Sequence, residues 1–441
     1  MSFDLLITFG LALLGGLILN VMPCVLPVLT GKVYKLVSQN ATAKGESPAE
    51  RLRSARVESA WYTLGVLLVF VAIIAATLSL KLAGREYSWG MQFQSPVFVG
   101  AVCLTMFLLG LNGLGVFEIT VSVSGSEKSG AVGSVFNGAV AAIMATPCSA
   151  PFLGAAITYA VKLDTPIWEM VVIFLLIGFG LALPFLAVAW FPSLARLLPR
   201  PGAWMVTFKQ LMGFTLLGAS VWMFGVLLKQ VNSDSAFWFL GFLLLVGLGA
   251  WAIDRFGGLE HDAGRRWAVK GLVVALLAAA GVYAFRFQPA AAIAATRSVD
   301  LHVAVLDGKI NWVSFSPEVV AIHQRRKQPV FVDYTAEWCV NCKANEKAVL
   351  ETETVRAALE ETRILPVKAD WTNEDELIGG ELKKLGRSGI PAYAIYLPDG
   401  SFDLLPEVIT ESMVVERLRA AAARFPADQY LSVEQACLAQ K

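Results

Sequence analysis

Eight apolar stretches follow one another along the first 287 residues, and they constrain the fold of this chain more than any other feature. They begin near Leu5, Trp61, Pro96, Ser134, Trp168, Trp204, Ala236 and Trp267. Each is long enough to cross a hydrocarbon core of about 30 Å as a helix. With 56% hydrophobic and 16% charged residues, the chain also lies outside the composition of soluble proteins. The sequence therefore predicts a polytopic α-helical membrane protein with about eight spans.

Basic residues in the loops between these stretches predict how the chain is oriented. Most of them lie in the first, fifth and seventh loops: Lys32, Lys35, Lys44, Arg51, Arg53, Arg56, Arg196, Arg200, Lys209, Arg255, Arg265 and Arg266. Because loops rich in Lys and Arg stay in the cytoplasm, both termini are expected on the other side of the membrane.

The run from Leu5 to Val21 has no basic segment before it and no cleavage site, so we interpret it as the first span.

Two proline–cysteine motifs stand three spans apart. Pro-Cys-Val-Leu-Pro at 23–27 returns as Pro-Cys-Ser-Ala-Pro at 147–151. An odd offset makes the two repeats enter the membrane in opposite directions, which predicts inverted three-helix repeats. The prolines break the helices, and such breaks are tolerated at membrane depth only where they are buried in protein or line a wet cavity. A thiolate also needs a wet, polar cavity. Buried cysteines are usually packing residues, but the duplicated frame favours a function for Cys24 and Cys148.

After Phe287 the composition changes from apolar runs to mixed, polar sequence. We predict three parts: a transmembrane domain at 1–287, a linker at 288–310 and a C-terminal α/β domain at 311–441. Ser-Pro at 316–317 predicts a helix start, and Asp-Gly at 399–400 predicts a hairpin turn. The remaining expected elements are strands at 329–334, 364–368, 392–397 and 402–405, a helix from 339, and a helix at 412–425.

The sequence Cys339-Val-Asn-Cys342 lies between a predicted strand and a predicted helix. The first sulfur of such a motif stands at a helix N-terminus, where free N–H groups and the helix dipole favour its thiolate. Cys339 is therefore expected to attack, and Cys342 to resolve the mixed disulfide. A zinc site would need two further ligands, and the chain has only three histidines, His261, His302 and His323. The spacing favours redox chemistry.

Three neighbours are candidate site residues. Asp333, on the preceding strand, is expected to be buried and to accept a proton from Cys342. Pro391 follows Ile390 just before a strand, and a cis bond there would place a backbone edge beside the disulfide. Glu346 comes four residues after Cys342 and is expected on the same helix face, although a solvated surface role is an equal alternative.

Four other residues have less specific interpretations. Cys103 lies in an apolar run without prolines and is expected to pack in the core, and Cys437 has no cysteine at a useful spacing. Gln92 and Gln94 precede an apolar stretch, where an interfacial position is commoner than a place in a cavity.

The chain resembles a known family at these motifs. Residues 331–339, Phe-Val-Asp-Tyr-Thr-Ala-Glu-Trp-Cys, resemble the hallmark of the thioredoxin fold. Residues 20–27 and 145–151 resemble the paired transmembrane cysteine motifs of the DsbD family, the thiol:disulfide interchange proteins of the bacterial inner membrane. The resemblance covers essentially the whole chain. Members of the family carry an immunoglobulin-like domain before the first span, so we expect either a short form or a truncated chain.

The resemblance implies a protein-disulfide reductase. Cytoplasmic thioredoxin would reduce a Cys24–Cys148 pair, which would reduce Cys339–Cys342 in a periplasmic thioredoxin-like domain. That domain would pass electrons to periplasmic disulfide proteins, with cytochrome c maturation among the possible destinations. Redox-active disulfides would be the only redox groups. The sequence has no Gly-rich dinucleotide fingerprint and no Walker motif, and nothing in it indicates nucleic-acid binding.

A transporter for a metal or small solute, with a thioredoxin-like regulatory domain, is the alternative from another class. Inverted repeats with broken helices are common in transporters, and cysteine sulfur binds soft ions such as Cu(I). The apolar stretches carry almost no charged residues or histidines, which disfavours this alternative.

Overall fold

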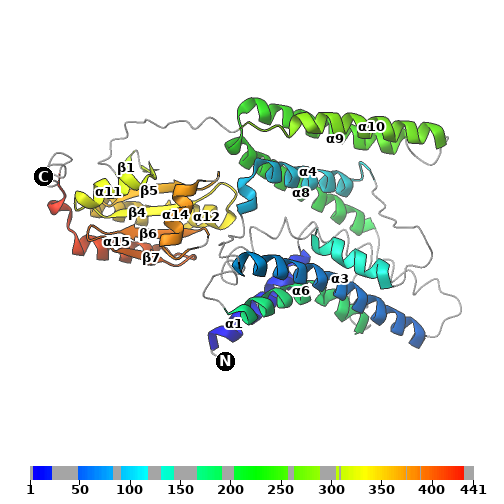
Figure 1. Cartoon of the computed structure of the whole chain (residues 1–441), viewed down its shortest axis with the longest axis horizontal. Coiled ribbons are helices and arrows are strands. Elements are labelled where there is room, and N and C mark those ends of the chain that lie inside the picture. Colours follow the sequence, from blue (N-terminus) through cyan, green and yellow to red (C-terminus); the bar gives the residue numbers. More distant parts are fainter. Residues whose placement is uncertain are drawn as a thin grey trace. The chain divides into compact units, whose positions relative to one another are not determined.

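The computed structural model describes residues 3–21, 48–82, 91–117, 131–143, 166–190, 203–256, 263–288, 304–306, 309–373, 375–387 and 389–431 (Figure 1). These residues form two compact units. The first comprises the described parts of 1–87 and 97–288, and the second those of 88–96 and 289–441. We describe each unit by itself.

The first unit is helical. Its elements are α1 (Phe3–Ile18), η1 (Leu19–Val21), α3 (Pro48–Leu82), α4 (Pro96–Leu114), the helix Ala131–Ile143, α6 (Ile167–Trp190), α8 (Ala203–Gln230), α9 (Ser233–Phe256) and α10 (Ala263–Ala284). Six of these helices, namely α3, α4, α6, α8, α9 and α10, are long and apolar enough to cross a membrane. Thr8–Ile18 and Ala131–Ile143 are shorter apolar helices at the first and fourth predicted spans. The count of eight and the inverted repeats stay predictions, because both proline–cysteine motifs lie outside the described residues.

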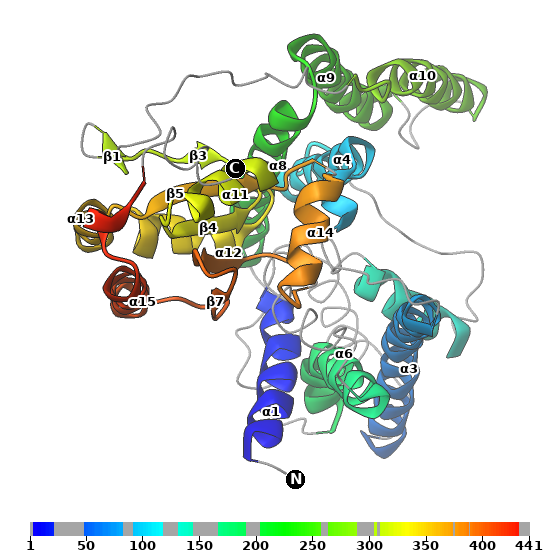
Figure 2. The same cartoon turned by 60° about the vertical axis from the view of Figure 1, so that its left-hand side comes forward.

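Glycines allow close helix contacts within this unit. Helix α6 lies beside α1 and α3 in both views (Figures 1 and 2). A Cβ on Gly16 of α1 would come within 2.3 Å of the Ile177 carbonyl oxygen, and one on Gly180 of α6 within 2.5 Å of that of Leu13. Since no real Cβ contact is so short, only glycine lets these two backbones meet, as in other membrane helix pairs.

Cys103 joins α4 to α8. It is fully buried, and its Sγ lies 3.4 Å from the hydroxyl oxygen of Ser220. The Ser220 hydroxyl in turn donates to the Cys103 carbonyl oxygen at 3.2 Å. This placement agrees with the packing role expected of Cys103, which has no cysteine partner among the described residues.

The second unit is built on a five-stranded mixed sheet. Its elements are η2 (Met91–Gln94), β1 (Val305–Leu306), β2 (Lys309–Ile310), β3 (Val313–Ser314), α11 (Pro317–Arg325), β4 (Val330–Thr335), α12 (Val340–Asn345), the π-turn η3 (Glu346–Leu350), α13 (Glu353–Thr362), β5 (Leu365–Asp370), α14 (Glu376–Lys384), β6 (Ala392–Tyr396), β7 (Phe402–Leu405), α15 (Glu411–Arg424) and η4 (Ala427–Gln429). The strand order is β3-β5-β4-β6-β7, and β1 with β2 forms a separate hairpin. Strand β4 lies at the centre, parallel to β5 and antiparallel to β6.

Alternation along β4 sends side chains to two buried faces. Phe331 packs with residues of η3, α13 and α15 on one face, and Val332 packs with residues of α11 and α14 on the other. Asp333 is odd-numbered like Phe331, so its carboxylate points to the face covered by η3, α13 and α15. This is the side of the sheet on which the cysteine motif begins its helix.

The predicted helix start and turn are both present. The Ser316 hydroxyl accepts a hydrogen bond from Val319 N at 3.2 Å, and Pro317 is the first residue of α11. Gly400, with φ of 82°, lies in the turn between β6 and β7. Such a positive φ favours glycine, which explains the Asp-Gly signal.

Candidate functional site

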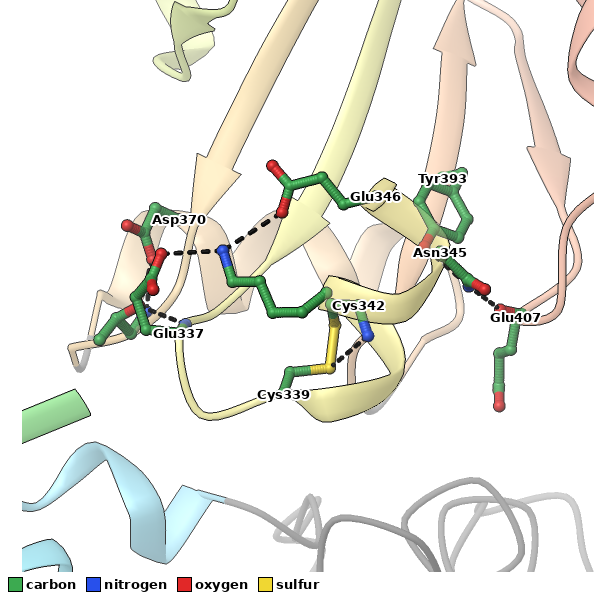
Figure 3. The surroundings of a disulfide bond; sticks show 10 residues. Glu337, Cys339, Cys342, Asn345, Glu346, Asp370, Tyr393 and Glu407 are labelled. Carbon is green, nitrogen blue, oxygen red and sulfur yellow. Dashed lines mark hydrogen bonds and ion pairs between the residues drawn. A yellow bond between two sulfur atoms is a disulfide. The ribbon is translucent and has the colours of Figure 1, made fainter. Parts of the chain in front are cut away.

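The two cysteines of the C-terminal motif form a disulfide at the start of α12. Their Cα atoms are 5.3 Å apart, and Cys339 is the N-cap residue of the helix (Figure 3). The backbone N–H of Cys342 points at Cys339 Sγ, with nitrogen and sulfur 3.2 Å apart. After reduction, this N–H and the helix N-terminus would stabilise a thiolate on Cys339. Cys342 is 2% exposed and Cys339 7%, so Cys339 is the more exposed residue of the pair.

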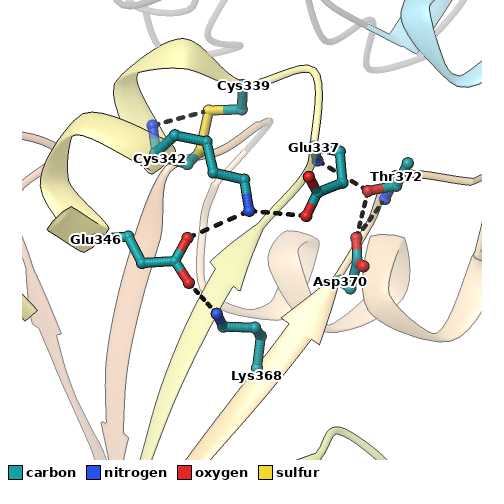
Figure 4. A network of polar contacts seen from close by, with 8 residues as sticks. Glu337, Cys339, Cys342, Glu346, Lys368, Asp370 and Thr372 are labelled. Carbon is teal, nitrogen blue, oxygen red and sulfur yellow. Dashed lines mark hydrogen bonds and ion pairs between the residues drawn. A yellow bond between two sulfur atoms is a disulfide. The ribbon is translucent and has the colours of Figure 1, made fainter. Parts of the chain in front are cut away.

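The loop that carries Cys339 is supported by the sequence Asp370-Trp371-Thr372 at the end of β5. The Thr372 hydroxyl accepts from Glu337 N at 2.8 Å, and Trp338 Nε1 donates to the Thr372 carbonyl at 3.3 Å. Thr372 is held by Asp370, whose Oδ1 accepts from both the backbone N–H and the hydroxyl of Thr372 (Figure 4). Sequence reasoning missed this support. Its only signal in the sequence was a short polar-aromatic run shortly after the strand predicted at 364–368.

Asp333 lies in the interior of the domain. It is 1% exposed, and its Oδ2 has no hydrogen-bond partner among the described residues. Its neighbours in the sheet are Lys368 on β5 and Tyr393 on β6. Burial raises the pKa of Asp333 to about 7, partly offset by the positive charge of Lys368 and reinforced by the negative charge of Glu346. A carboxyl group with this pKa can both accept and release a proton near neutral pH.

Glu346 is held by two lysines. It follows the last residue of α12 and begins the π-turn η3, so it lies just beyond the α-helix predicted to carry it. Its Oε1 pairs with Lys368 Nζ, and its Oε2 lies 3.2 Å from Lys343 Nζ (Figure 4). Burial by itself would raise the pKa of Glu346, but the two lysines outweigh it and lower the pKa below its ordinary value. Glu346 is 7% exposed, so the solvated surface role is wrong.

Lys343 extends this network toward the loop before the disulfide. Its Nζ lies 2.8 Å from Glu337 Oε1 and 3.2 Å from Glu346 Oε2. Burial lowers its pKa, but the two carboxylates outweigh that effect and raise it. Lys368 also lies 5.0 Å from the centre of the Trp312 ring. The two lysines, which the sequence analysis did not single out, keep Glu346 charged and leave Asp333 as the buried acid that titrates.

Pro391 stands at the start of β6, and the Ile390–Pro391 bond is cis. Ala392, the next residue, is the register partner of Tyr334 on β4. A second link joins α12 to β6, because Asn345 Nδ2 donates to Tyr393 Oη at 3.0 Å (Figure 3). The C-terminal candidates Cys339, Cys342, Asp333, Glu346 and Pro391 therefore belong to one end of β4 and the elements that adjoin it.

The membrane candidates Cys24 and Cys148 lie outside the described residues, as does Cys437, and their roles stay predictions. Asn20, the first residue of the motif that contains Cys24, is described. Its Nδ2 donates to the Gly180 carbonyl at 3.3 Å and thereby ties the end of α1 to α6.

Within the described part of the chain, no group of three or more His, Cys, Asp and Glu side chains is placed to hold a metal.

Two families match separate parts of the chain. Residues 5–228 match the family described as "Cytochrome C biogenesis protein transmembrane domain", and residues 311–398 match one described as "Thioredoxin-like". The chain is 29% identical over 415 residues to thiol:disulfide interchange protein DsbD of Ralstonia nicotianae, covering 88% of this chain and 63% of that protein. The corresponding protein of a Pseudomonas species is 28% identical over 402 residues, covering 86% of this chain and 65% of that protein.

Among solved structures, the oxidised C-terminal domain of DsbD from Neisseria meningitidis is 22% identical. The match covers 25% of this chain and 98% of that one, with a TM-score of 0.22. The chain spans less than two thirds of the length of the curated relatives named above. Because the transmembrane family covers more than half of the sequence, this multi-pass membrane protein belongs to the DsbD family.

Proposed function

We propose that this protein transfers reducing equivalents from cytoplasmic thioredoxin across the bacterial inner membrane to periplasmic disulfide proteins. It would act as a protein-disulfide reductase, with its C-terminal domain in the periplasm. The observation that carries the proposal is the Cys339–Cys342 disulfide at a helix start, with the Cys342 N–H 3.2 Å from Cys339 Sγ. Membership of the DsbD family and similarity to curated proteins named thiol:disulfide interchange proteins support it.

Electrons would move in two exchanges. The dithiol of thioredoxin reduces a Cys24–Cys148 disulfide and becomes oxidised itself. One thiolate of the reduced membrane pair then attacks the Cys339–Cys342 disulfide, and the other closes the membrane disulfide again, which leaves Cys339 and Cys342 as thiols. Each exchange carries two electrons and two protons, so we propose that disulfides are the only redox groups required.

In the delivery step, the Cys339 thiolate attacks an acceptor disulfide, which breaks the acceptor S–S bond, releases one acceptor thiolate and forms a mixed disulfide. Cys342 gives its proton to Asp333, and its thiolate attacks Cys339 Sγ. The Cys339–Cys342 bond forms, the bond to the acceptor breaks, and the acceptor leaves as a dithiol after its two thiolates have taken up two protons. The burial of Asp333 and the pKa of about 7 support this role, and the lysine-bound Glu346 beside it stays charged throughout. Pro391 would supply the backbone edge against which the acceptor lies.

Trapping thiols in living cells tests the route. Cys24→Ala and Cys148→Ala are compared with wild type by acid quenching and alkylation with a reagent that adds mass to each free thiol. Cys103→Ala is the matched control, because Cys103 is a buried membrane-helix cysteine packed against Ser220. We expect Cys339 and Cys342 to accumulate as the disulfide in both motif variants and to stay partly reduced in the control.

A reduced C-terminal pair in either motif variant would overturn the route. Loss of cytoplasmic thioredoxin should produce the same oxidised state as the motif variants. If removing thioredoxin has no effect while the motif variants do, the donor is wrong and the membrane pair remains supported.

A further inference from the structure

A short segment far upstream in the sequence packs against the C-terminal domain beside the disulfide. Residues 88–96 belong to the same compact unit as residues 289–441. Their described part includes the 3-10 turn η2, Met91–Gln94, which Ser95 closes by donating from its N–H to the Gln92 carbonyl at 3.2 Å. In the sequence this segment lies between α3 and α4.

Phe93 is the apolar anchor of this segment. Its ring lies over that of Trp338, with ring centres 6.2 Å apart and planes inclined by 22°. Phe93 is 3% exposed and Trp338 is 7% exposed. Offset stacking of two buried aromatic rings is a favourable contact. Trp338 is the residue immediately before Cys339, so the contact involves the chain neighbour of the attacking cysteine.

Gln94 is the polar anchor. Its Nε2 donates to the Trp371 carbonyl at 3.3 Å, and Gln94 is 7% exposed. Trp371 belongs to the run that supports the cysteine loop, and its own N–H donates to the Thr335 carbonyl at the end of β4. The Gln94 amide is thus bound to the domain that carries the disulfide, and the interfacial position expected for Gln94 stays a prediction.

Exchange with a protein disulfide needs room around Cys339. The acceptor disulfide must lie in line with Cys339 Sγ. The acceptor backbone on either side of that disulfide must then rest against the residues that flank Cys339. Trp338 is the nearest of these, and Phe93 covers it. A small disulfide has no such backbone and needs far less of this surface.

We propose that the surface formed by Trp338 and Trp371 is the docking site of the chain's own residues 91–96, and that this segment and the protein acceptors of Cys339 occupy it in turn. The inference rests on the proposed function, because it concerns the access of acceptors to the same disulfide. Docking of the segment shields Cys339 from proteins in general, and an acceptor gains access by displacing Phe93.

Two measurements on the full-length protein in detergent test this proposal. In the first, a photoreactive benzoylphenylalanine replaces Phe93, and mass spectrometry identifies the peptide to which it cross-links. We expect the peptide that contains Trp338 or the one that contains Trp371. Cross-linking to neither of them would overturn the docking.

In the second measurement, the reduced protein transfers two electrons and two protons to a disulfide, either of insulin or of the small reagent dithionitrobenzoate. We expect Phe93→Ala to speed the reaction with insulin about five-fold, which corresponds to the loss of one stacked aromatic contact, and to leave the small reagent nearly unaffected. Val97→Ala is the control, since Val97 is 51% exposed.

Equal rates for wild type and Phe93→Ala with insulin would overturn the competition, even if the cross-link forms. Acceleration of both substrates alike would also overturn it, because that result indicates a general loosening of the cysteine loop. If the reduced protein acts on neither substrate, the proposed function fails, whereas the cross-link still reports on the docking.

Discussion

Asp333 on β4 and Lys368 on β5 are register partners in neighbouring parallel strands, and their side chains lie on the same face of the sheet. Lys368 also pairs with Glu346, so one ammonium group acts on both buried acids near the disulfide. Its charge lowers the pKa of Asp333, against the larger effect of burial. The proton affinity of the site is therefore set by groups from two strands, β4 and β5, and from the turn η3.

Lys368→Met should raise the pKa of Asp333 above its value of about 7, by about one unit, because it removes a nearby positive charge. With dithionitrobenzoate, the second thionitrobenzoate is released when Cys342 resolves the mixed disulfide, and the pH midpoint of that step should move upward. Lys384→Met is the control, since Lys384 forms an exposed pair with Glu381. An unchanged midpoint in Lys368→Met would contradict this role of Lys368.

Asp333→Asn should stabilise the C-terminal domain at pH 8 and do so less at pH 4. The folded-state pKa of about 7 lies above the ordinary value of 3.8, so the folded protein holds a proton that the unfolded chain has lost between these values. The free energy of unfolding of the wild type therefore falls as pH rises from about 4 to about 7, by up to ~4 kcal/mol. The amide of Asn carries no such charge. Urea midpoints followed by pulse proteolysis of the full chain measure the difference, and a pH-independent gap between the two proteins would refute it.

Thr372→Val should loosen the loop before the disulfide. The substitution removes the acceptor of the Glu337 N–H and the hydroxyl bound by Asp370, each worth about 1 kcal/mol. We expect faster hydrogen exchange at the Glu337 amide in the full-length protein. Thr410→Val, which removes the cap of α15, is the matched control and should leave that amide unchanged. Equal exchange at Glu337 in all three proteins would count against the supporting role of Thr372.

Gly16→Ala should destabilise the membrane unit by roughly 1–3 kcal/mol, because its Cβ would force α1 away from α6. The melting temperature of the detergent-solubilised protein measures the effect. Gly10→Ala in the same helix is the control, since nothing lies within 4 Å of a Cβ there. If both variants melt alike, the close contact of these helices is not needed for stability.

Local signals in the sequence predicted the parts of the fold that depend on single residues. The cap at Ser316, the turn at Gly400 and strand β4 follow from side chains that act on their own backbone or alternate into a core. Helices α13 and α14 were missed, although Asp375 caps α14 by accepting from Leu377 N at 2.8 Å. A single polar residue before a short, mixed sequence is too weak a signal without the tertiary contacts that stabilise it.

The candidate site was predictable in its cysteines and less so in its charges. The spacing of Cys339 and Cys342 and the position of Asp333 can be derived from the chain alone. The roles of Lys343, Lys368 and Thr372 depend on which strands become neighbours, and no local pattern encodes that pairing. The π-turn at Glu346 likewise depends on the packing around it.

The position of β4 at the centre of the sheet has a practical consequence for labelling. The residues placed around the disulfide come from α12, the turn η3, the upstream segment η2, and β4 and its two immediate neighbours with the loops that adjoin them, whereas β7 on the outer edge contributes none. The tip between β6 and β7, at Asp399-Gly400, is therefore a suitable insertion point for a fluorophore or an epitope. A probe there would report on the domain without touching its chemistry.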